Sequence, residues 1–582
     1  MARFHSRIAS LGAGVAGLSL VLATASPGAT STAPSRAFGV PIQHAYPAGL
    51  AQRQSRVRNG SQPCTGNDGP TNGTSFFVGI TNESNVAHEG GSAVLGGVSN
   101  TACDGSTGVG AGNVNDVGTG NGDADYSFIG GGASNTITNG MAFIGGGEVN
   151  TVNGEQAFVG AGYNNKANGS NSFVGAGGGE YEAESGAKVA QGNFADGIDS
   201  FIGAGDMNYV TSAGSGSFIG AGGESNASTM NTQGNNISGI DSFIGAGDSN
   251  DVSANLAAVV GGYINKASGY VAFVGAGSSN TASGQAAFVG GGGGNVAGGT
   301  NAFIGAGNGN AATGEGSFVG DGGTTTANTA AATDSFIGAG DQNTNDGSES
   351  FIGAGSLNTI NTAGTYATLA GGYQNTVSGP YASILGGFGN STTGSYATVA
   401  GGRNDTATGE LSFVAGYHAD AVNSGSFVWS DYSAGSALVK DTVKNEFVVR
   451  ASGGVVFYSN EGATTGVQLS PGEGTFASLS DRNAKTNIVP LDDASILAKV
   501  DALPIDRWSY KSDTSVRHVG PMAQDFYAAF GTGVDDRHIT SIDEDGVALA
   551  AIKALHSENQ QLKSQLAALE VKVDGLTSAA GR

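Results

Sequence analysis

The stretch SFIGGGASNTITNGMAFIGGGEVN, residues 127–150, carries the pattern that decides the fold. Phe128 recurs fifteen residues later as Phe143, and Asn135 recurs as Asn150. The same spacing runs through most of the chain. The aromatic column comprises Phe128, Phe143, Phe158, Phe173, Phe243, Phe273, Phe288, Phe303, Phe318, Phe336, Phe351 and Phe413, with Ala258, Thr368, Ser383 and Thr398 in equivalent places. The asparagine column comprises residues 135, 150, 165, 250, 265, 280, 295, 310, 343, 358, 375 and 390.

A period of this kind indicates a repeat architecture. Each unit has one or two short apolar strands and a turn of glycine and asparagine, and a unit so small buries its apolar face only by stacking on its neighbours. Asparagine tolerates the left-handed backbone region, and identical stacked asparagines can form a ladder. The sequence therefore predicts a mostly β protein: a parallel β-solenoid over residues 93–430 with about 20 rungs, on the order of 100 Å long.

The repeated motif SFIGAGxxN resembles the head repeats of trimeric autotransporter adhesins over roughly residues 93–430. The resemblance implies a left-handed parallel β-roll that packs as a homotrimer. The chain departs from that family in having no C-terminal run of alternating membrane strands.

Some intervals in the aromatic column are longer than the repeat, for example from Phe173 to Phe201 and from Phe218 to Phe243. We interpret the extra residues as loops that leave the solenoid. In solenoids such insertions are often the binding face, and tolerated decoration is the alternative. The segment GNGDADYS, residues 120–127, is an isolated near-match to a calcium-binding repeat, but no aspartate column accompanies it. We therefore expect no metal and no cofactor.

The composition restricts the partners. Glycine accounts for 103 of 582 residues, only 12% of residues are charged, and the net charge is −24 with an isoelectric point near 4.5. Such an acidic chain is not expected to bind nucleic-acid backbones or anionic membrane surfaces. The partners we expect are further copies of the chain and, for the solenoid, a surface glycan or another cell-surface ligand.

The N-terminus has the features of a signal peptide. Arg3 and Arg7 precede an apolar run, and the segment 23–25 (ATA) fits a cleavage site for residues 1–25. We expect an exported, extracellular or cell-surface protein with no membrane span in the mature chain. Residues 26–92 are expected to be a partly disordered segment. Cys64 and Cys103 form one disulfide in this interpretation, and two unpaired cysteines are the alternative.

The pattern changes near residue 430. Residues 431–479 are predicted to be a β-rich connector, and residues 480–545 a small α+β domain with helices at 492–503 and 520–531 and a strand at 505–511. Residues 546–578 are predicted to form a coiled-coil helix, with a single amphipathic helix as the alternative. Its heptad positions are Ile552, Leu555, Asn559, Leu562, Leu566, Leu569, Val573 and Leu576. Asn559 at an a position often favours dimers, so the heptads alone leave dimer and trimer open.

Four segments of this region, in this order, resemble the intramolecular chaperone domain that ends phage tailspikes, endosialidases and related fibres. They are SDRNAKTNI (480–488), RWSYK (507–511), HVGPMAQDF (518–526) and DEDGVALAAIKAL (543–555). That family is a self-cleaving trimerisation module. The resemblance implies that the domain assembles three chains and then removes itself, as a single-turnover serine endopeptidase that acts only on its own chain.

The resemblance assigns Ser480 as the nucleophile and Lys485 as the general base. A serine hydroxyl needs an adjacent base, and a lysine can serve when its amine is neutral. The expected cut is Leu479–Ser480, with Ser480–Asp481 as the alternative bond. Asp481, Arg482 and Asn483 match the motif without an individual role. His518 and Gln524 match the second motif and are expected to be structural. A polar turn without chemistry is the competing interpretation.

Three functions follow from these patterns. The first is an exported homotrimeric, adhesin-like fibre that a C-terminal chaperone assembles before its own release. The second is a phage-type tail fibre or tailspike, which the signal peptide argues against. The third is a surface glycan-active enzyme on a β-solenoid, which needs paired carboxylates across a groove.

Overall fold

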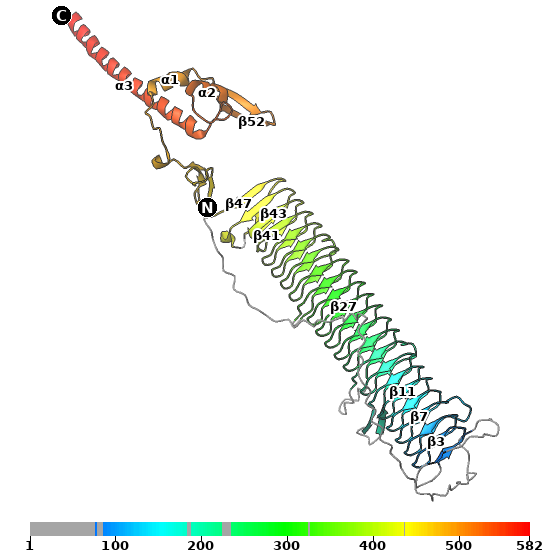
Figure 1. The fold of residues 1–582 in the computed structure, drawn as a ribbon. Coiled ribbons are helices and arrows are strands. Elements are labelled where there is room, and N and C mark those ends of the chain that lie inside the picture. Colours follow the sequence, from blue (N-terminus) through cyan, green and yellow to red (C-terminus); the bar gives the residue numbers. More distant parts are fainter. Residues whose placement is uncertain are drawn as a thin grey trace, which may run out of the picture. The chain divides into compact units, whose positions relative to one another are not determined.

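The computed structural model describes Cys64, residues 76–77, 85–182, 188–223, 234–323, 326–435 and 437–581. The expected signal peptide and almost all of the segment 26–92 lie outside these residues. Within the described part of the chain, a parallel β-solenoid precedes a small antiparallel sheet and a C-terminal α+β domain (Figure 1).

Each rung of the solenoid contributes one short strand to each of two parallel sheets. The first sheet has 23 strands and includes β3 (Ala93–Val94), β7 (Phe128–Ile129), β11 (Phe158–Val159), β27 (Phe288–Val289), β43 (Phe413–Tyr417) and β47 (Phe447–Arg450). Phe128 pairs with Phe143, and Phe143 pairs with Phe158, so the register follows the fifteen-residue repeat. The predicted β-solenoid is confirmed.

The alternation within each strand explains the core. The second residue of a strand points inward and is fully buried, as Ile129 and Val159 are, and equivalent residues of both sheets form one continuous apolar core. The first residue points outward, and the phenylalanines there are only half-buried. Their rings stack from rung to rung, for example Phe173 on Phe201 with 4.7 Å between ring centroids. We call this column of stacked rings the phenylalanine ridge.

The asparagine column forms a buried ladder between rungs. Asn265 illustrates it: its backbone N–H donates to Asn250 Oδ1 at 3.0 Å, and its Nδ2 donates to the carbonyl oxygens of Gly261 and Gly277, each at 2.9 Å. These asparagines do not occupy the left-handed region that asparagine tolerates. The residue before each one turns the chain there, including the β-branched Ile264 at φ 54°. The ladder holds the asparagine side chain inward, so its predecessor takes the left-handed conformation.

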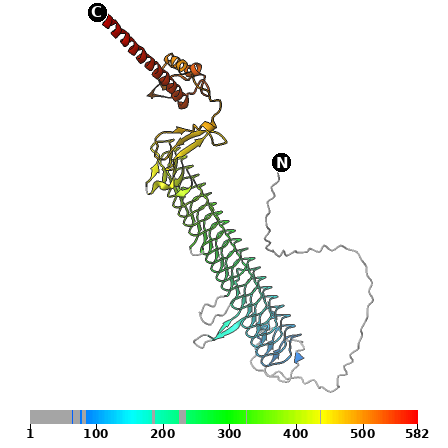
Figure 2. The same cartoon turned by 90° about the vertical axis from the view of Figure 1, so that its left-hand side faces the viewer.

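The solenoid extends past its expected end at residue 430. Strand β47 pairs in parallel with β45 (Phe427–Ser430), because Phe447 continues the phenylalanine ridge after a longer interval. The first long insertion contains an antiparallel hairpin, β14 (Gly179–Glu182) and β15 (Lys188–Gln191), which stands out from the side of the solenoid (Figure 2). The 224–233 part of the second insertion lies outside the described residues.

The connector ends in a three-stranded antiparallel sheet. Its strands are β48 (Val455–Tyr458), β49 (Gly466–Leu469) and β50 (Ala477–Ser478), in that order. The chain passes from this sheet directly into the segment that resembles the chaperone motif.

The C-terminal domain has three helices and one hairpin. They are α1 (Asp493–Asp501), β51 (Asp506–Tyr510), β52 (Asp513–Gly520), α2 (Ala523–Phe530) and α3 (Ser541–Ala580). Its small core contains Ile496, Phe526, Val547, Ala550 and Ala551. Lys553 of α3 forms a 2.8 Å ion pair with Asp493 of α1.

Helix α3 begins at Ser541, five residues before the expected start at Gly546. Thr540 caps it: Thr540 Oγ1 accepts from the backbone N–H of Asp543 at 3.2 Å and donates to Asp543 Oδ2 at 2.7 Å. This cap satisfies first-turn groups, and the helix tolerates Gly546 in its interior. No helix of the described residues is both long and apolar enough to cross a membrane.

Candidate cleavage site

The bond that was expected to be cut lies where the antiparallel sheet ends. Strand β50 ends at Ser478, and the N–H of Leu479 still donates to the carbonyl oxygen of Gly466 across the sheet at 3.0 Å. Ser480 is the first residue beyond this pairing, and its side chain is exposed. The Leu479 carbonyl therefore lies at a strand end that is fixed by the hydrogen bond to Gly466, and Ser480 begins the next segment.

A single 3-10 turn, Arg482–Ala484, shapes the segment after Ser480. Asp481 caps the turn, because its Oδ1 accepts from the backbone N–H of Asn483 at 2.9 Å and from Asn483 Nδ2 at 3.1 Å. At the other end, the N–H of Lys485 donates to the carbonyl oxygen of Arg482 at 3.3 Å. This turn reverses the chain and returns Lys485 to Ser480.

The two residues assigned as base and nucleophile are in contact. Lys485 Nζ donates a hydrogen bond to Ser480 Oγ at 2.5 Å. A lysine can accept the serine proton only through a neutral amine, and removal of water favours the neutral form. Every residue from 480 to 490 is exposed in the single chain. The single chain thus has the dyad geometry without the shielding that general-base chemistry needs.

The second motif lies on other elements. His518 is on β52, where its ring stacks on Trp508 with centroids 4.6 Å apart and meets Tyr510 edge-on at 5.5 Å. Gln524 lies in the first turn of α2 and is exposed. Neither side chain has a hydrogen bond to Ser480 or Lys485 among the described contacts. The structure therefore brings Ser480 and Lys485 together, and leaves His518 in an aromatic cluster of the hairpin.

Comparison with known families identifies this region. Residues 480–535 match the model of the family Peptidase_S74, described as chaperone of endosialidase. This part of the chain is a chaperone-of-endosialidase domain. None of the curated proteins compared with the chain matches it. A β-solenoid followed by such a domain fits a tail-fibre- or tailspike-like protein with a C-terminal chaperone.

The match to the chaperone family begins at Ser480, the residue that starts the turn. It covers α1, the β51–β52 hairpin and α2, and it ends before α3. The chaperone domain therefore follows directly on the bond Leu479–Ser480.

An apolar strip beside the dyad was not predicted from the sequence. Ile488, Val489 and Leu491 of the chaperone domain follow Lys485 closely and are 54%, 75% and 60% exposed. The signal was present as the run NIVPL, residues 487–491, within an otherwise polar segment. Exposed apolar side chains next to a polar site suit a surface that another chain covers.

The remaining predicted residues lie at the N-terminal end of the solenoid. Cys64 and Cys103 are joined by a disulfide. The near-match to a calcium repeat, residues 120–127, belongs to a loop around the buried Asp104. This carboxylate accepts from the N–H groups of Gly120, Gly122 and Ala124 at 2.6, 3.2 and 2.9 Å. The described residues contain no group of histidine, cysteine and acidic side chains suited to hold a metal ion.

Proposed function

We propose that the protein is an exported homotrimeric fibre whose C-terminal chaperone domain assembles three chains and is then released by autoproteolysis between Leu479 and Ser480. The observation that carries the proposal is the 2.5 Å contact of Lys485 Nζ with Ser480 Oγ. The contact lies at the junction between the connector sheet and the chaperone domain, where one cut separates the assembly module from the solenoid.

The chemistry is an internal acyl transfer followed by hydrolysis. Lys485, as a neutral amine, takes the hydroxyl proton while Ser480 Oγ attacks the carbonyl carbon of Leu479. The C–N bond breaks, the nitrogen of Ser480 takes up a proton from Lys485, and Leu479 is left as an ester on Ser480 Oγ. Water then hydrolyses the ester and gives the carboxylate of Leu479 and a free Ser480. A cut of the next bond, Ser480–Asp481, is the alternative.

Trimerisation gives the dyad the environment that the single chain lacks. When neighbouring chains cover the strip of Ile488, Val489 and Leu491, water is excluded from the turn that carries Ser480 and Lys485. Loss of water favours the neutral amine. The cut is then timed to assembly, because an unassembled chain keeps its dyad in solvent.

Helix α3 supports association through its exposed seam. Beyond Ala554 every described residue of the helix is exposed, and its apolar a and d side chains are between 48% and 70% exposed. The apolar members of this seam are Ile552, Leu555, Leu562, Leu566, Leu569, Val573 and Leu576. An apolar seam of this kind is stable in water only against other helices. The chaperone family is a trimerisation module, and this favours an assembly of three chains over one of two.

The phenylalanine ridge supports a second contact between chains. Its rings lie on the outer face of the first sheet, where Phe128, Phe243 and Phe351 are about 40% exposed. Runs of exposed stacked rings, interrupted at Ala258, Thr368, Ser383 and Thr398, mark an interaction surface. A slip by one rung replaces each phenylalanine with its neighbour, so the ridge alone specifies the register poorly. A chaperone that first aligns the C-termini removes this ambiguity.

Export rests on the signal peptide expected at residues 1–25. The disulfide of Cys64 and Cys103 agrees with an oxidising compartment. A phage-type fibre assembled in the cytoplasm is the alternative, and it requires residues 1–25 to remain on the protein.

The proposal is tested with the wild-type chain and the Ser480→Ala variant, both produced with residues 1–25 in a secreting bacterial host. Denaturing gels report cleavage, N-terminal sequencing reports signal removal, and sedimentation reports the oligomeric state. The expected result is two wild-type fragments, an uncut variant, and trimers of both outside the cytoplasm. Cytoplasmic protein that keeps residues 1–25 favours the phage-type fibre, and an uncut monomeric wild type overturns the proposal.

A further inference from the structure

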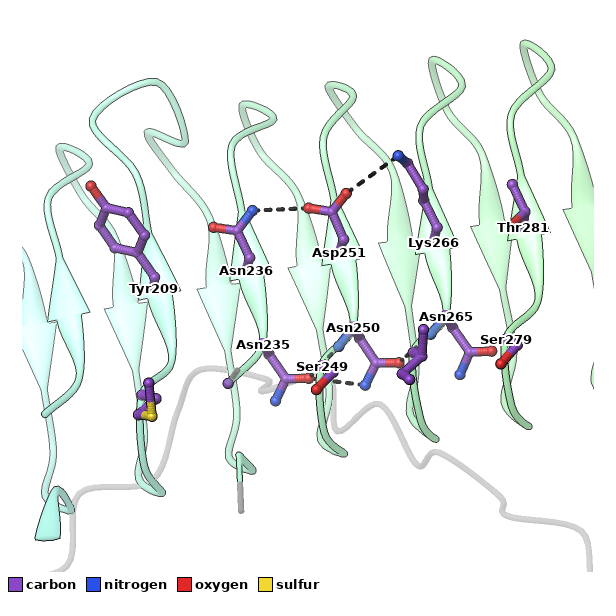
Figure 3. Close-up of a pocket in the computed structure, with 13 residues that line it drawn as sticks. Tyr209, Asn235, Asn236, Ser249, Asn250, Asp251, Asn265, Lys266, Ser279 and Thr281 are labelled. Carbon is purple, nitrogen blue, oxygen red and sulfur yellow. Dashed lines mark hydrogen bonds and ion pairs between the residues drawn. The ribbon is translucent and has the colours of Figure 1, made fainter. Parts of the chain in front are cut away.

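A shallow groove crosses five successive rungs on the outer face of the second sheet (Figure 3). The strands that form it are β18 (Tyr209–Val210), β20 (Asn236–Ile237), β22 (Asp251–Val252), β24 (Lys266–Ala267) and β26 (Thr281–Ala282). Their first residues point outward and line the groove, namely Tyr209, Asn236, Asp251, Lys266 and Thr281.

The polar side chains of the groove are ordered by one another. Asn236 Nδ2 donates to Asp251 Oδ1 at 2.9 Å, and Lys266 Nζ lies 3.9 Å from Asp251 Oδ2. Figure 3 shows this row along the rungs, with the asparagine ladder below it. Amide, carboxylate and ammonium groups thus stand in line, one for each rung, with both carboxylate oxygens of Asp251 engaged.

An aromatic platform closes one end of the row. The ring of Tyr209 is 38% exposed and meets the ring of Phe194 edge-on, with centroids 6.1 Å apart. Tyr209 Oη donates to Asp196 Oδ2 at 2.9 Å, which fixes the ring. On the far side, Lys166 Nζ lies 4.9 Å above the ring of Phe194. Tyr209 is therefore a fixed, partly exposed ring in the lining of the groove.

Gly234 lines the groove next to Asn235 and Asn236. The same turn column holds Met207, Ser249 and Ile264 in neighbouring rungs. A Cβ on Gly234 would lie 2.2 Å from the carbonyl oxygen of Met207, so this position cannot carry a side chain.

This set of residues differs from the rest of the column. Elsewhere the outward position of this sheet mostly holds threonine, serine, alanine or valine, as at Thr136, Thr151, Thr329 and Thr344. Phe194 and Tyr209 are its aromatic residues among the described strands. The aromatic pair, the charged row and the groove occur together in one short part of the solenoid. The outward positions of this sheet do not need these residue types to form the solenoid.

We propose that this groove binds a neutral oligosaccharide that lies along the solenoid. A sugar ring offers an apolar face to a held aromatic ring and hydroxyl groups to planar amide and carboxylate groups. Rungs repeat at ~4.8 Å, close to the length of one sugar unit, so successive units meet Asn236, Asp251 and Lys266 in turn. Lys266 balances the charge of Asp251, and the net charge of −24 disfavours an acidic glycan.

The inference deepens the proposed fibre function and rests on it for the class of partner. Binding and cleavage are measured separately, so either can fail alone. If the fibre is cut at Leu479–Ser480 but binds no sugar, the assembly proposal stands and the proposal of sugar binding in the groove is contradicted.

The test presents the full secreted protein with immobilised linear oligomers of glucose, galactose, mannose and N-acetylglucosamine. Sialylated and sulfated oligosaccharides and a set of unrelated peptides are included. Titration calorimetry with the best probe then compares the wild type with Tyr209→Ala, Tyr209→Phe and Asp251→Asn. Tyr381→Ala is the matched control, because Tyr381 is also an exposed tyrosine, at 48% against 38% for Tyr209, and stacks on Tyr366 away from the groove.

The expected result is binding of a neutral oligomer that weakens about tenfold or more in Tyr209→Ala and Asp251→Asn. Tyr209→Phe keeps the ring and retains most of the affinity, and Tyr381→Ala binds like the wild type. Thermal unfolding equal to that of the wild type shows that these surface changes leave the fold intact. The proposal is overturned if no neutral oligomer binds, if acidic glycans or peptides bind in preference, or if Tyr209→Ala binds unchanged.

Discussion

Lys485 Nζ donates a hydrogen bond of 2.5 Å to Ser480 Oγ, although the two residues stand five positions apart. The 3-10 turn between them makes this contact, and Asp481 caps the turn through the N–H of Asn483. The turn is exposed, and no other described element packs on it to replace that cap. The relation of nucleophile and base thus depends on a local structure that single substitutions can weaken.

The first prediction concerns the cap of this turn. Asp481→Ala removes the acceptor for Asn483, and loss of such a cap typically costs about 1 kcal/mol. We expect cleavage to slow about fivefold, with trimer formation unchanged, when fragment release is followed over time. Asp481→Asn restores an acceptor and should restore the rate. Asp513→Ala removes a similar carboxylate cap, at Ser515 in the β51–β52 hairpin, and serves as control. Equal slowing in both alanine variants would contradict a positioning role for Asp481.

The second prediction concerns the helical seam. Leu562→Asp places a charge at a d position of α3, which disfavours the coiled coil. We expect a monomer in sedimentation and an uncut chain on the gel, because the dyad stays in solvent. Ser564→Asp adds the same charge outside the a/d seam and should leave both assembly and cleavage intact. A trimeric, normally cut Leu562→Asp protein would show that α3 does not drive assembly.

The third prediction concerns the asparagine ladder. Asn265→Ala leaves the N–H of Asn280 and the carbonyl oxygens of Gly261 and Gly277 without their side-chain partners inside the solenoid. Each unsatisfied buried group costs about 1–3 kcal/mol. We expect the free energy of unfolding to fall by about 3 kcal/mol or more in urea titration. Ser278→Ala, at an exposed turn position close by, should change it by less than about 0.5 kcal/mol. A tolerated Asn265→Ala would mean that the ladder is dispensable.

The fourth prediction concerns pH. Asp405 takes the place of an asparagine at the end of the ladder, where Ala419 N–H donates to its Oδ1 while its Oδ2 is buried without a described partner. Burial raises the pKa of Asp405 from 3.8 to about 6. The folded state therefore keeps the proton that the unfolded chain loses near pH 4. This contribution is complete below pH 4 and is lost as the pH rises through about 6.

We therefore expect Asp405→Asn to be more stable than the wild type at pH 7.5, by between about 1 and 3 kcal/mol. The difference should shrink at pH 4.5, because the wild-type carboxyl is then neutral. Urea titration at both values measures it. Burial also raises the pKa values of Asp116 and Asp420, so the comparison uses the difference between variant and wild type at each pH. A difference that is independent of pH would contradict a buried neutral acid.

The solenoid could be predicted because its core repeats in one dimension. Phe128 and Phe143 show the period of fifteen residues, and the stacking of successive rungs then implies parallel strand pairing at that period. The conformation of the turn could not be read in the same way. Asparagine tolerates the left-handed region in isolation, but the buried ladder needs it inside the rung, and Ile264 takes that conformation instead. Tertiary hydrogen bonds here override a local preference.

The candidate cleavage site could be recognised from the order of its motifs in the sequence. Its surroundings could not be predicted in this way. Ser480 and Lys485 stand out as a pair, yet their exposure and the neighbouring strip of Ile488, Val489 and Leu491 appear only in three dimensions. The groove of Tyr209, Asn236 and Asp251 was missed for the opposite reason. Its residues occupy outward positions that recur every fifteen residues from Asn236 onward but differ in residue type, and an insertion separates Tyr209 from Asn236 in sequence.

The most direct test is the intact mass of the purified secreted wild-type protein. Autoproteolysis by Ser480 and Lys485 predicts two species, residues 26–479 and residues 480–582, and a single uncut species for Lys485→Arg, whose guanidinium stays protonated and cannot act as a base. A cut after Ser480 would move the scissile bond by one residue and keep the dyad. A trimeric wild type of full mass would contradict self-cleavage, and the chaperone domain would then be a permanent clamp of the fibre.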